Sequence, residues 1–260
     1  MAHTGVLILG GSSEGYTLAE RLAADRRVEV TTSLAGVTRE RRRPAGGLRV
    51  GGFGGPDGLA QFLAERKIAA VVDATHPFAD RISANAAEAA EAAGVPILHL
   101  VRPAWVPREG DDWIDVADME EAAAAIPERA SPTFLTVGRT ELAPFARRRD
   151  IRFLARVIDP PEHDLGFVDL ELLFGRGPFD YETERRLVVA HGVRCLVTKN
   201  SGGEAARAKL DAARDLGLPV VMVRRPKPPE GERAEGVTEA LAWIERLIGP
   251  SGPAAVETGH

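Results

Sequence analysis

Cysteine, lysine and aromatic residues are scarce in this sequence, and long apolar runs are absent. Cys195 is the only cysteine among 260 residues, which excludes a scaffold held together by disulfide bonds within the chain. No segment approaches the roughly 20 apolar residues of a membrane span. The apolar run from Val6 to Leu9 is too short for the core of a signal peptide. These absences predict a cytoplasmic protein that does not contact a membrane.

Other absences bear on the type of ligand. Aromatic residues make up only 5% of the chain and the formal net charge is −5, which argues against nucleic-acid binding. The six histidines are scattered, without a Cys-x-x-Cys or His-Glu-x-x-His pattern, so no metal site is predicted. A small-molecule ligand is therefore favoured.

Arginine is abundant where lysine is not, since only four of the 33 basic residues are lysine. A genome rich in Arg and Ala codons explains much of this excess, but it does not explain where the arginines cluster. Arg39 and Arg41 to Arg43 lie close together after the second predicted strand. Because a guanidinium group binds phosphate and carboxylate in a two-pronged manner, this cluster suits an anionic ligand.

Short β-branched runs alternate with alanine-rich helical stretches through most of the chain. Val6 to Leu9, Val28 to Thr32 and Ala70 to Asp73 are predicted strands, and Phe78 to Ala93 is a predicted helix. This alternation is typical of βαβ units and predicts an α/β fold with mostly parallel sheets. Further predicted elements are strands at Trp113 to Val116 and Val220 to Val223, helices from Thr140 to about Arg148, at Gly203 to Leu216 and at Val237 to Ile248, and a loop at Pro226 to Glu232.

The two halves of the sequence resemble each other. When Val71 is aligned with Arg194, Thr75 falls on Thr198 and Arg102-Pro103 falls on Arg225-Pro226 without a gap. Any two βαβ units share some likeness, but the matched Thr and Arg-Pro positions favour a duplicated architecture. We therefore predict two Rossmann-like lobes with a ligand cleft between them. The predicted boundaries are residues 1–103 for the N-terminal lobe, 104–249 for the C-terminal lobe and 250–260 for a flexible tail.

A glycine-rich turn, Gly10-Gly11-Ser12-Ser13-Glu14-Gly15, joins the first strand to the first helix. Such a turn lets the backbone approach a pyrophosphate, which the N–H groups of the helix N-terminus then bind. Ser12 stands where the dinucleotide fingerprint has its middle glycine, and glycine-rich turns also occur for structural reasons alone. In this position the turn favours nucleotide binding. Without a Walker lysine, it does not indicate P-loop ATP chemistry.

The end of the second strand discriminates between cofactors. An NAD site usually has a carboxylate there for the ribose hydroxyls, but this chain has Ser33-Leu34-Ala35-Gly36 followed by Arg39. Hydroxyl and guanidinium groups suit the extra phosphate of NADP, although a solvated basic helix start would also explain the arginines. The sequence favours NADP over NAD.

Two further turns follow predicted strands. Asp73-Ala74-Thr75-His76-Pro77-Phe78-Ala79 ends one strand, and Thr198-Lys199-Asn200-Ser201-Gly202-Gly203 ends its counterpart in the other half. The carboxyl ends of parallel strands are where α/β proteins bind ligands. His76 could donate a proton there, although a lone histidine is more often structural. The second turn suits an anion or an amide.

Taken in order, these four segments resemble the precorrin-6A reductase family of cobalamin biosynthesis, with likeness from Val6 to about Ile248. The family often has Arg or Thr where this chain has Val37, which leaves Arg39 as the nearby phosphate contact. The resemblance implies two Rossmann-like lobes, NADPH as cofactor, and hydride transfer to a tetrapyrrole macrocycle with addition of a proton. The macrocycle carries a rim of carboxylates. Arg102 and Arg225 are candidate contacts for that rim, weaker than Arg39 is for the cofactor.

The resemblance also implies roles for individual residues. The catalytic candidates are Lys199 and His76, either of which would protonate the reduced ring, although a solvent proton would serve equally. Alternatives left open are reduction of the cobalt-containing macrocycle and a non-catalytic nucleotide sensor, and a monomer is plausible. The expected cofactor contacts are Gly10, Gly11, Ser12, Ser13, Glu14, Gly15, Ser33, Leu34, Ala35, Gly36, Arg39, Thr75 and His76, and the expected substrate contacts are Thr198, Lys199, Asn200, Ser201, Gly202 and Gly203.

Overall fold

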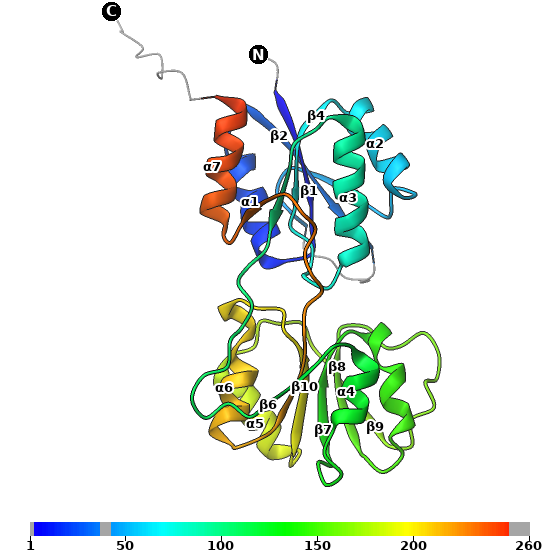
Figure 1. The fold of residues 1–260 in the computed structure, drawn as a ribbon. Helices are drawn as coiled ribbons and strands as arrows, with labels where there is room; N and C mark the ends of the chain where they lie inside the picture. Colours follow the sequence, from blue (N-terminus) through cyan, green and yellow to red (C-terminus); the bar gives the residue numbers. More distant parts are fainter. Residues whose placement is uncertain (1–2, 37–42, 250–260) are drawn as a thin grey trace, which may run out of the picture. The chain divides into compact units, whose positions relative to one another are not determined.

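The computed structural model describes residues 3–36 and 43–249. Arg39, Arg41 and Arg42, together with the predicted tail at 250–260, lie outside the described residues. The chain forms two compact units, each built on a six-stranded sheet whose strands all pair in parallel (Figure 1). The predicted α/β class with two Rossmann-like lobes is confirmed.

The first unit has the strand order β12-β5-β4-β1-β2-β3. Helices α1 and α7 cover one face of this sheet and α2 and α3 cover the other (Figure 1). The strands are β1 (Thr4–Leu9), β2 (Val28–Leu34), β3 (Gly47–Val50), β4 (Ile68–Asp73), β5 (Ile97–Leu100) and β12 (Glu232–Ala234), and the helices are α1 (Ser13–Ala23), α2 (Pro56–Glu65), α3 (Asp80–Ala93) and α7 (Val237–Ile248).

The second unit has the strand order β6-β11-β10-β7-β8-β9. Helix α5 packs against α6, and α4 packs against β11 and the 3₁₀ segment η2. The strands are β6 (Trp113–Val116), β7 (Thr133–Thr136), β8 (Phe153–Val157), β9 (Leu170–Phe174), β10 (Cys195–Lys199) and β11 (Val220–Val223), the α-helices are α4 (Met119–Ala125), α5 (Tyr181–Ala190) and α6 (Ala208–Asp215), and the 3₁₀ segments are η1 (Arg139–Glu141), η2 (Ala143–Arg147) and η3 (Glu204–Ala206).

The central strand β1 shows why its sequence is a continuous apolar run. Val6 and Ile8 join the core under α1 and α7, whereas Leu7 and Leu9 join the core under α2 and α3. Since side chains alternate between the faces of a strand, a strand covered on both faces needs apolar residues at every position. Ser12 then caps α1, because its side chain accepts a hydrogen bond from the backbone N–H of Gly15.

Several predicted elements match the structure residue for residue, and others differ. The strands at Trp113–Val116 and Val220–Val223 and the helix at Val237–Ile248 have the predicted bounds. The predicted helix after Thr140 is instead two short 3₁₀ segments, η1 and η2, and the predicted helix from Gly203 divides into η3 and α6. The structure also contains β9, which was not predicted, and β12, which overlaps the predicted loop.

The predicted C-terminal boundary is wrong for the segment from Lys227 to Gly249, which belongs to the first unit. Strand β12 pairs with β5, so that Ala234 lies opposite Leu100. Helix α7 buries Trp243 and Ile244 in the core of that unit. Because the chain re-enters the first unit here, the edge of β5 gains a paired strand and the apolar face of α7 gains a core to pack on. A division of the chain in sequence order could not anticipate this.

The two sheets have the same strand order when β1, β2, β3, β4 and β5 are matched with β7, β8, β9, β10 and β11. The register differs from the sequence alignment. Val6 pairs with Ala70 in the first sheet, and Phe134 pairs with Leu196 in the second, so Asp73 corresponds to Lys199. The predicted match of Thr75 with Thr198 is therefore wrong, because Thr198 lies within β10 and Thr75 lies beyond the end of β4.

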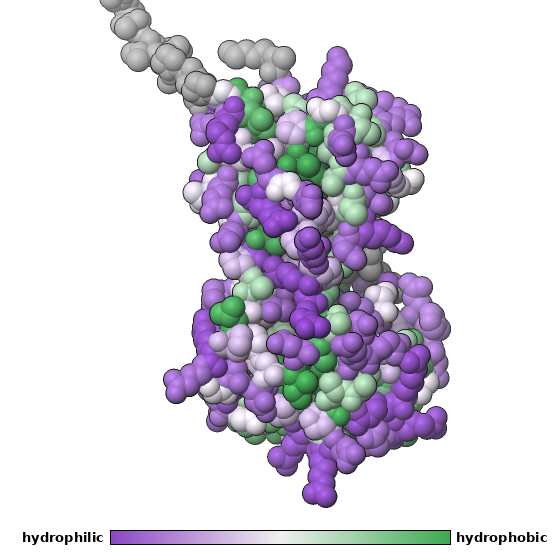
Figure 2. Space-filling model, in the orientation of Figure 1, coloured by the Kyte–Doolittle hydropathy of each residue, from purple (hydrophilic) through white to green (hydrophobic). Residues whose placement is uncertain are grey.

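The surface is mainly hydrophilic on the face shown in Figure 2, with small scattered apolar groups on both units. Val106, Val168 and Phe174 are among the exposed large apolar side chains. None of the helices in the described ranges combines the length and the apolar character that crossing a lipid bilayer requires.

Candidate functional site

The carboxyl ends of β1 and β4 form the candidate site of the first unit. Leu9 at the end of β1 lies opposite Asp73 at the end of β4. The helices that follow, α1 and α3, lie on opposite faces of the sheet (Figure 1). Such a divergence opens a crevice beyond the strand ends, which is the usual ligand site of open α/β sheets.

The glycine turn lies against the Thr75-His76 turn at this edge. A Cβ atom placed on Gly11 would lie 3.8 Å from the backbone nitrogen of His76, and Gly11 has a φ of +145° that favours glycine. A Cβ atom on Gly15 would lie 3.1 Å from the Cβ of Ala74, so Gly15 permits close packing of α1 on the end of β4. Gly15 thus fills the role of the third glycine of a dinucleotide turn.

The polar groups of the turn divide into bonded and available ones. The hydroxyl of Ser12 donates to the carbonyl of Ala74 at 2.7 Å and accepts from the N–H of Gly15 at 3.2 Å. Its single proton is therefore committed within the chain. The backbone N–H groups of Gly11, Ser12 and Ser13 make no hydrogen bond within the described part of the chain. These N–H groups, rather than the Ser12 hydroxyl, are the donors that an anion at the turn would meet.

Glu14 holds an ion pair next to this turn. Its carboxylate lies 2.8 Å from the guanidinium of Arg102 and accepts from the hydroxyl of Ser13 at 3.0 Å. Partial burial raises the pKa of Glu14, but Arg102 and the hydrogen bonds outweigh burial and hold the pKa below its usual value. The pairing partly neutralises a carboxylate that would otherwise repel an anion in the turn.

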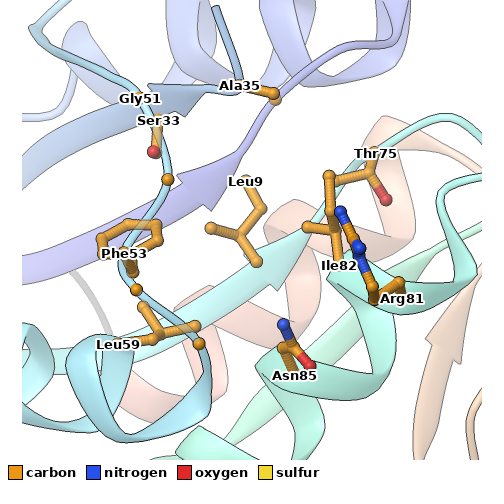
Figure 3. A pocket seen from close by; sticks show the side chains of 14 residues that line it. Leu9, Ser33, Ala35, Gly51, Phe53, Leu59, Thr75, Arg81, Ile82 and Asn85 are labelled. Atoms are coloured by element: carbon orange, nitrogen blue, oxygen red, sulfur yellow. The ribbon is translucent and has the colours of Figure 1, made fainter.

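A cavity of about 600 Å³ opens beside the glycine turn (Figure 3). Gly10, Ser33, Ala35 and Thr75, all predicted cofactor contacts, line it. Leu34 and Gly36 do not line the cavity, and Leu34 is buried at the end of β2. The structure therefore brings together four of the predicted contacts around one concave surface.

Other walls of the cavity were not predicted. Phe53 and Leu59 lie on one side, and Arg81 and Ile82 on the other, with Asn85 below (Figure 3). Phe53 belongs to the segment Gly51-Gly52-Phe53-Gly54-Gly55 after β3, whose four glycines were a signal available in the sequence. Residues from α3 carried no such signal.

Arg49 holds this glycine-rich segment in place. Its guanidinium carbon lies 3.7 Å from the centre of the Phe53 ring, and Nη2 donates to the carbonyl of Gly52 at 2.9 Å. A stacked guanidinium and a backbone hydrogen bond restrict the ring to one side of the cavity. Phe53 therefore presents a fixed aromatic wall.

His76 lies in the neighbouring turn but does not line the cavity. Its Nδ1 accepts a hydrogen bond from the backbone N–H of Phe78 at 3.3 Å, and the two rings lie 5.8 Å apart. The Nδ1 atom of His76 is thus engaged within its own turn.

The second unit places Lys199 at the carboxyl end of β10, where it meets Glu141. The ammonium of Lys199 lies 2.7 Å from a carboxylate oxygen of Glu141, which also accepts from the backbone N–H of Gly138 at 2.8 Å. Gly138 comes after β7 and Val137, close to the place that Gly10 has directly after β1. The carboxylate of Glu141 thus occupies the anion position of the second turn.

The remaining residues of the Thr198–Gly203 segment contact the chain itself. Thr198 is buried within β10. The amide of Asn200 accepts from the N–H of Trp105 at 2.8 Å and donates to its carbonyl at 2.9 Å, while the Trp105 indole donates to the carbonyl of Gly203 at 2.8 Å. The predicted substrate turn therefore anchors the segment around Trp105.

Gly202 and Ser201 complete this anchored turn. A Cβ atom on Gly202 would lie 2.1 Å from the carbonyl oxygen of Pro103, so only glycine fits there. Ser201 is 7% exposed, and its N–H donates to the carbonyl of Lys199 at 2.7 Å. Arg225, a weaker predicted substrate contact, donates to the carbonyl of Asn200 at 3.2 Å. Of this segment, Lys199 has the side chain best suited to chemistry.

The described ranges contain no cluster of side chains suited to a metal ion. No three His, Cys, Asp or Glu side chains come together there in a way that could hold a metal ion. Cys195, the one cysteine of the sequence, is buried, and burial raises the pKa of its thiol to about 12.

Comparison with known proteins decides the family. Residues 5–245 match the family model described as precorrin-6x reductase CbiJ/CobK. The chain belongs to the precorrin-6x reductase family. The precorrin-6A reductase of Rhodococcus erythropolis is 47% identical over 94% of this chain and 98% of its own length. The cobalt-precorrin-6A reductase of Priestia megaterium is 31% identical over 85% of this chain and 91% of its own length.

A solved structure supports the same relationship. The structure of a CobK precorrin-6A reductase matches this chain with a TM-score of 0.89 and 37% identity, covering 94% of this chain and 97% of that one. The resemblance predicted from the glycine turn, the Thr75-His76 turn and the Lys199 turn is therefore confirmed as a family relationship.

Proposed function

We propose that the chain reduces precorrin-6A to its dihydro product in cobalamin biosynthesis, with NADPH as the reductant. Family membership over residues 5–245 carries this proposal. The glycine turn beside a cavity in the first unit supports a dinucleotide, and the basic residues after β2 favour the phosphorylated form. When bound, NADPH supplies the hydride, and the protein orients the cofactor and limits access of water.

Residues of the first unit would bind the cofactor. The backbone N–H groups of Gly11, Ser12 and Ser13 would donate to the pyrophosphate, since they have no other partner in the described chain. The cavity lined by Ser33 and Phe53 would hold the adenosine end. Arg81 lines the same cavity and would supply a cation near a phosphate, in addition to the proposed contact from Arg39.

Lys199 and His76 remain the proposed groups for handling the proton. Lys199 is bonded to Glu141, and this carboxylate would hold the ammonium in one position at the strand end. The other proposed substrate residues, from Thr198 to Gly203, would act through the backbone shape of their turn, because the Asn200 side chain already bonds to Trp105. A cleft between the two units remains a prediction.

Lys199 can be tested by substitution. Lys199→Met should lower kcat by about 10²-fold if the ammonium donates the proton, as is typical for removal of a general acid. Lys199→Arg keeps the charge but not the acidity, and NADPH affinity should stay unchanged in both variants. An unchanged kcat in Lys199→Met would assign the proton to His76 or to solvent.

The alternatives differ in what they do to NADPH. A reductase oxidises it when the correct macrocycle is present, whereas a nucleotide sensor binds it and leaves its near-ultraviolet absorbance constant. Metal-free and cobalt-loaded precorrin-6A assayed in parallel separate the two reductase alternatives. We expect faster turnover with the metal-free substrate, since the identity to the Rhodococcus precorrin-6A reductase exceeds that to the Priestia cobalt-precorrin enzyme. Absence of NADPH oxidation with both substrates would contradict the proposal.

A further inference from the structure

A buried hydrogen-bond network lies directly behind Thr75 in the cavity wall. Asp73 is 3% exposed and His99 is fully buried, with His99 Nδ1 3.0 Å from one oxygen of the Asp73 carboxylate. The other oxygen accepts from the Thr75 hydroxyl at 2.7 Å and from the Thr75 backbone N–H at 3.1 Å. One carboxylate thus connects β4, β5 and the turn that lines the cavity.

Ser83 in the first turns of α3 extends this network. Its hydroxyl lies 3.2 Å from the Thr75 hydroxyl. Burial raises the pKa of Asp73, but its polar neighbours His99, Ser83 and Thr75 outweigh burial and lower the pKa below its usual value. The carboxylate therefore acts only as an acceptor, and the side chains bonded to it, His99 and Thr75, must donate.

His99 is fixed by the same reasoning. A carboxylate needs a donor, so Nδ1 carries a proton. Nε2 is buried and has no hydrogen-bond partner among the described residues, and a proton there would be buried without an acceptor. The tautomer protonated on Nδ1 alone therefore has the lowest free energy. In this state His99 holds the carboxylate and cannot rotate to offer an alternative donor.

The network determines what Thr75 can offer to a ligand. A hydroxyl has one proton and two acceptor sites, and the proton of Thr75 is committed to Asp73. Ser83 can occupy only one of the two acceptor sites of the Thr75 hydroxyl. Thr75 lines the cavity. A lone pair of its hydroxyl that meets a ligand there can only accept, so the ligand group must donate.

We propose that Asp73 and His99 are positioning residues that fix Thr75 as a hydrogen-bond acceptor for an amino group of the dinucleotide. This inference rests on the proposed function, because the cavity is taken as the cofactor site. NADPH carries two such groups, the carboxamide –NH₂ of the nicotinamide and the exocyclic –NH₂ of the adenine. The shared chemistry is a planar N–H donor, and two cofactor analogues distinguish the sources.

The experiment measures dissociation constants by titration calorimetry for NADPH, for an analogue with an acetyl group in place of the carboxamide, and for an analogue with hypoxanthine in place of adenine. Thr75→Val should weaken NADPH binding about ten-fold, as expected for one lost hydrogen bond and an unpaired partner. Thr75→Ser keeps the hydroxyl and should stay within about two-fold. The analogue that lacks the contacted amino group should bind Thr75→Val and wild type equally.

Asp73→Asn tests the positioning role. The amide would donate to Thr75, whose hydroxyl would then offer its proton to the ligand. NADPH binding should therefore weaken as much as in Thr75→Val. Binding of the analogue without the contacted amino group should not weaken. His99→Phe should show a smaller loss of the same selectivity. If Asp73→Asn does not fold, the comparison of Thr75→Val with Thr75→Ser decides the inference.

Thr183→Val is the matched control. Thr183 also donates to an aspartate, Asp180, at 3.1 Å, but it lies on an exposed helix start in the second unit. It should leave all three dissociation constants unchanged. Equal losses with all three cofactors, or no loss in Thr75→Val, would overturn the inference while leaving the proposed function intact. A wild-type chain that binds none of the three would contradict the proposed function itself.

Discussion

The first turns of the two units have the same place in the topology but opposite electrostatic arrangements. In the second unit, Glu141 folds back to accept the N–H of Gly138 and pairs with Lys199. In the first unit, Glu14 turns to Arg102, and the N–H groups of Gly11 to Ser13 stay without partners in the described chain. One turn carries its own anion, and the other can accept an external one.

The charge at the corresponding strand end is also inverted. Asp73 ends β4 and is buried with His99, whereas Lys199 ends β10 and is partly exposed beside Glu141. A fold used twice thus has a turn with unbonded backbone N–H groups in one unit and an ammonium paired with a carboxylate in the other, within the described chain. The comparison teaches that equal strand order says where a site lies, and that local charge pairing says what it binds.

The largest expected effect comes from substituting the strained glycines of the two turns. Gly202→Ala places a Cβ atom 2.1 Å from the carbonyl of Pro103 at a φ of +68°, so the second unit should lose more than about 3 kcal/mol of unfolding free energy. Gly11→Ala meets no atom closer than 3.8 Å and should cost about 1–2 kcal/mol. Chemical denaturation measures both. Equal losses of unfolding free energy in Gly202→Ala and Gly11→Ala would contradict the difference between the two turns.

Acid should act mainly on the first unit. The pKa of buried Asp73 is lowered from its usual value of 3.8, so its stabilising effect is present above about pH 4 and is lost as the pH falls through the folded-state pKa. In the second unit, the carboxyls with lowered pKa, Asp150 and Asp180, are exposed and contribute little. Pulsed hydrogen exchange should show β4 and α3 opening before β10 and α6.

Asp73→Asn is the control for this acid effect. It should lower stability at neutral pH by about 2 kcal/mol, because a buried ionic acceptor is lost. It should also flatten the pH dependence of exchange in the first unit below about pH 4. Exchange that rises equally in both units of the wild type would contradict the comparison.

Much of this arrangement followed from the sequence, for physical reasons. Val6 to Leu9 had to be a strand covered on both faces, since every position is apolar, and Ser12 followed by Gly15 marked the start of α1. That Gly10, Ser33, Ala35 and Thr75 line one cavity agrees with the rule that ligands bind at the carboxyl ends of parallel strands. These signals are local in sequence.

The rest depends on contacts between distant residues. The pairing of β12 with β5 depends on an open sheet edge more than a hundred residues earlier in the chain. The role of Asn200 depends on Trp105, which no local pattern connects to it. The register of β10 against β7 places Thr198 inside the sheet, whereas Thr75 lies beyond the end of β4. The sequence motif and the family resemblance included Thr198 in the predicted site without this register.

A moderate effect is expected from removing the carboxylate charge of each first turn. Glu14→Gln removes a carboxylate charge beside the glycine turn, so NADPH should bind about two- to five-fold tighter, with about 1 kcal/mol or less of lost stability. Glu141→Gln should leave NADPH affinity unchanged and lower kcat, because Lys199 is no longer held. Titration and steady-state kinetics measure the two. The same response in both variants would contradict the assignment of different roles to the two turns.

The smallest expected effect is a change in the rate at which Cys195 is labelled, which reports on the second unit alone. Cys195 is the only thiol of the chain, lies in β10 and is fully buried, with a pKa raised to about 12. An aromatic disulfide reagent at pH 8 should therefore react only when this unit opens, since both access and thiolate are lacking in the folded state. Gly202→Ala should accelerate labelling strongly, whereas Gly11→Ala should not, because it strains the other unit. Acceleration by both variants would show that the two units open together, and the comparison between them would then apply to ligand chemistry but not to stability.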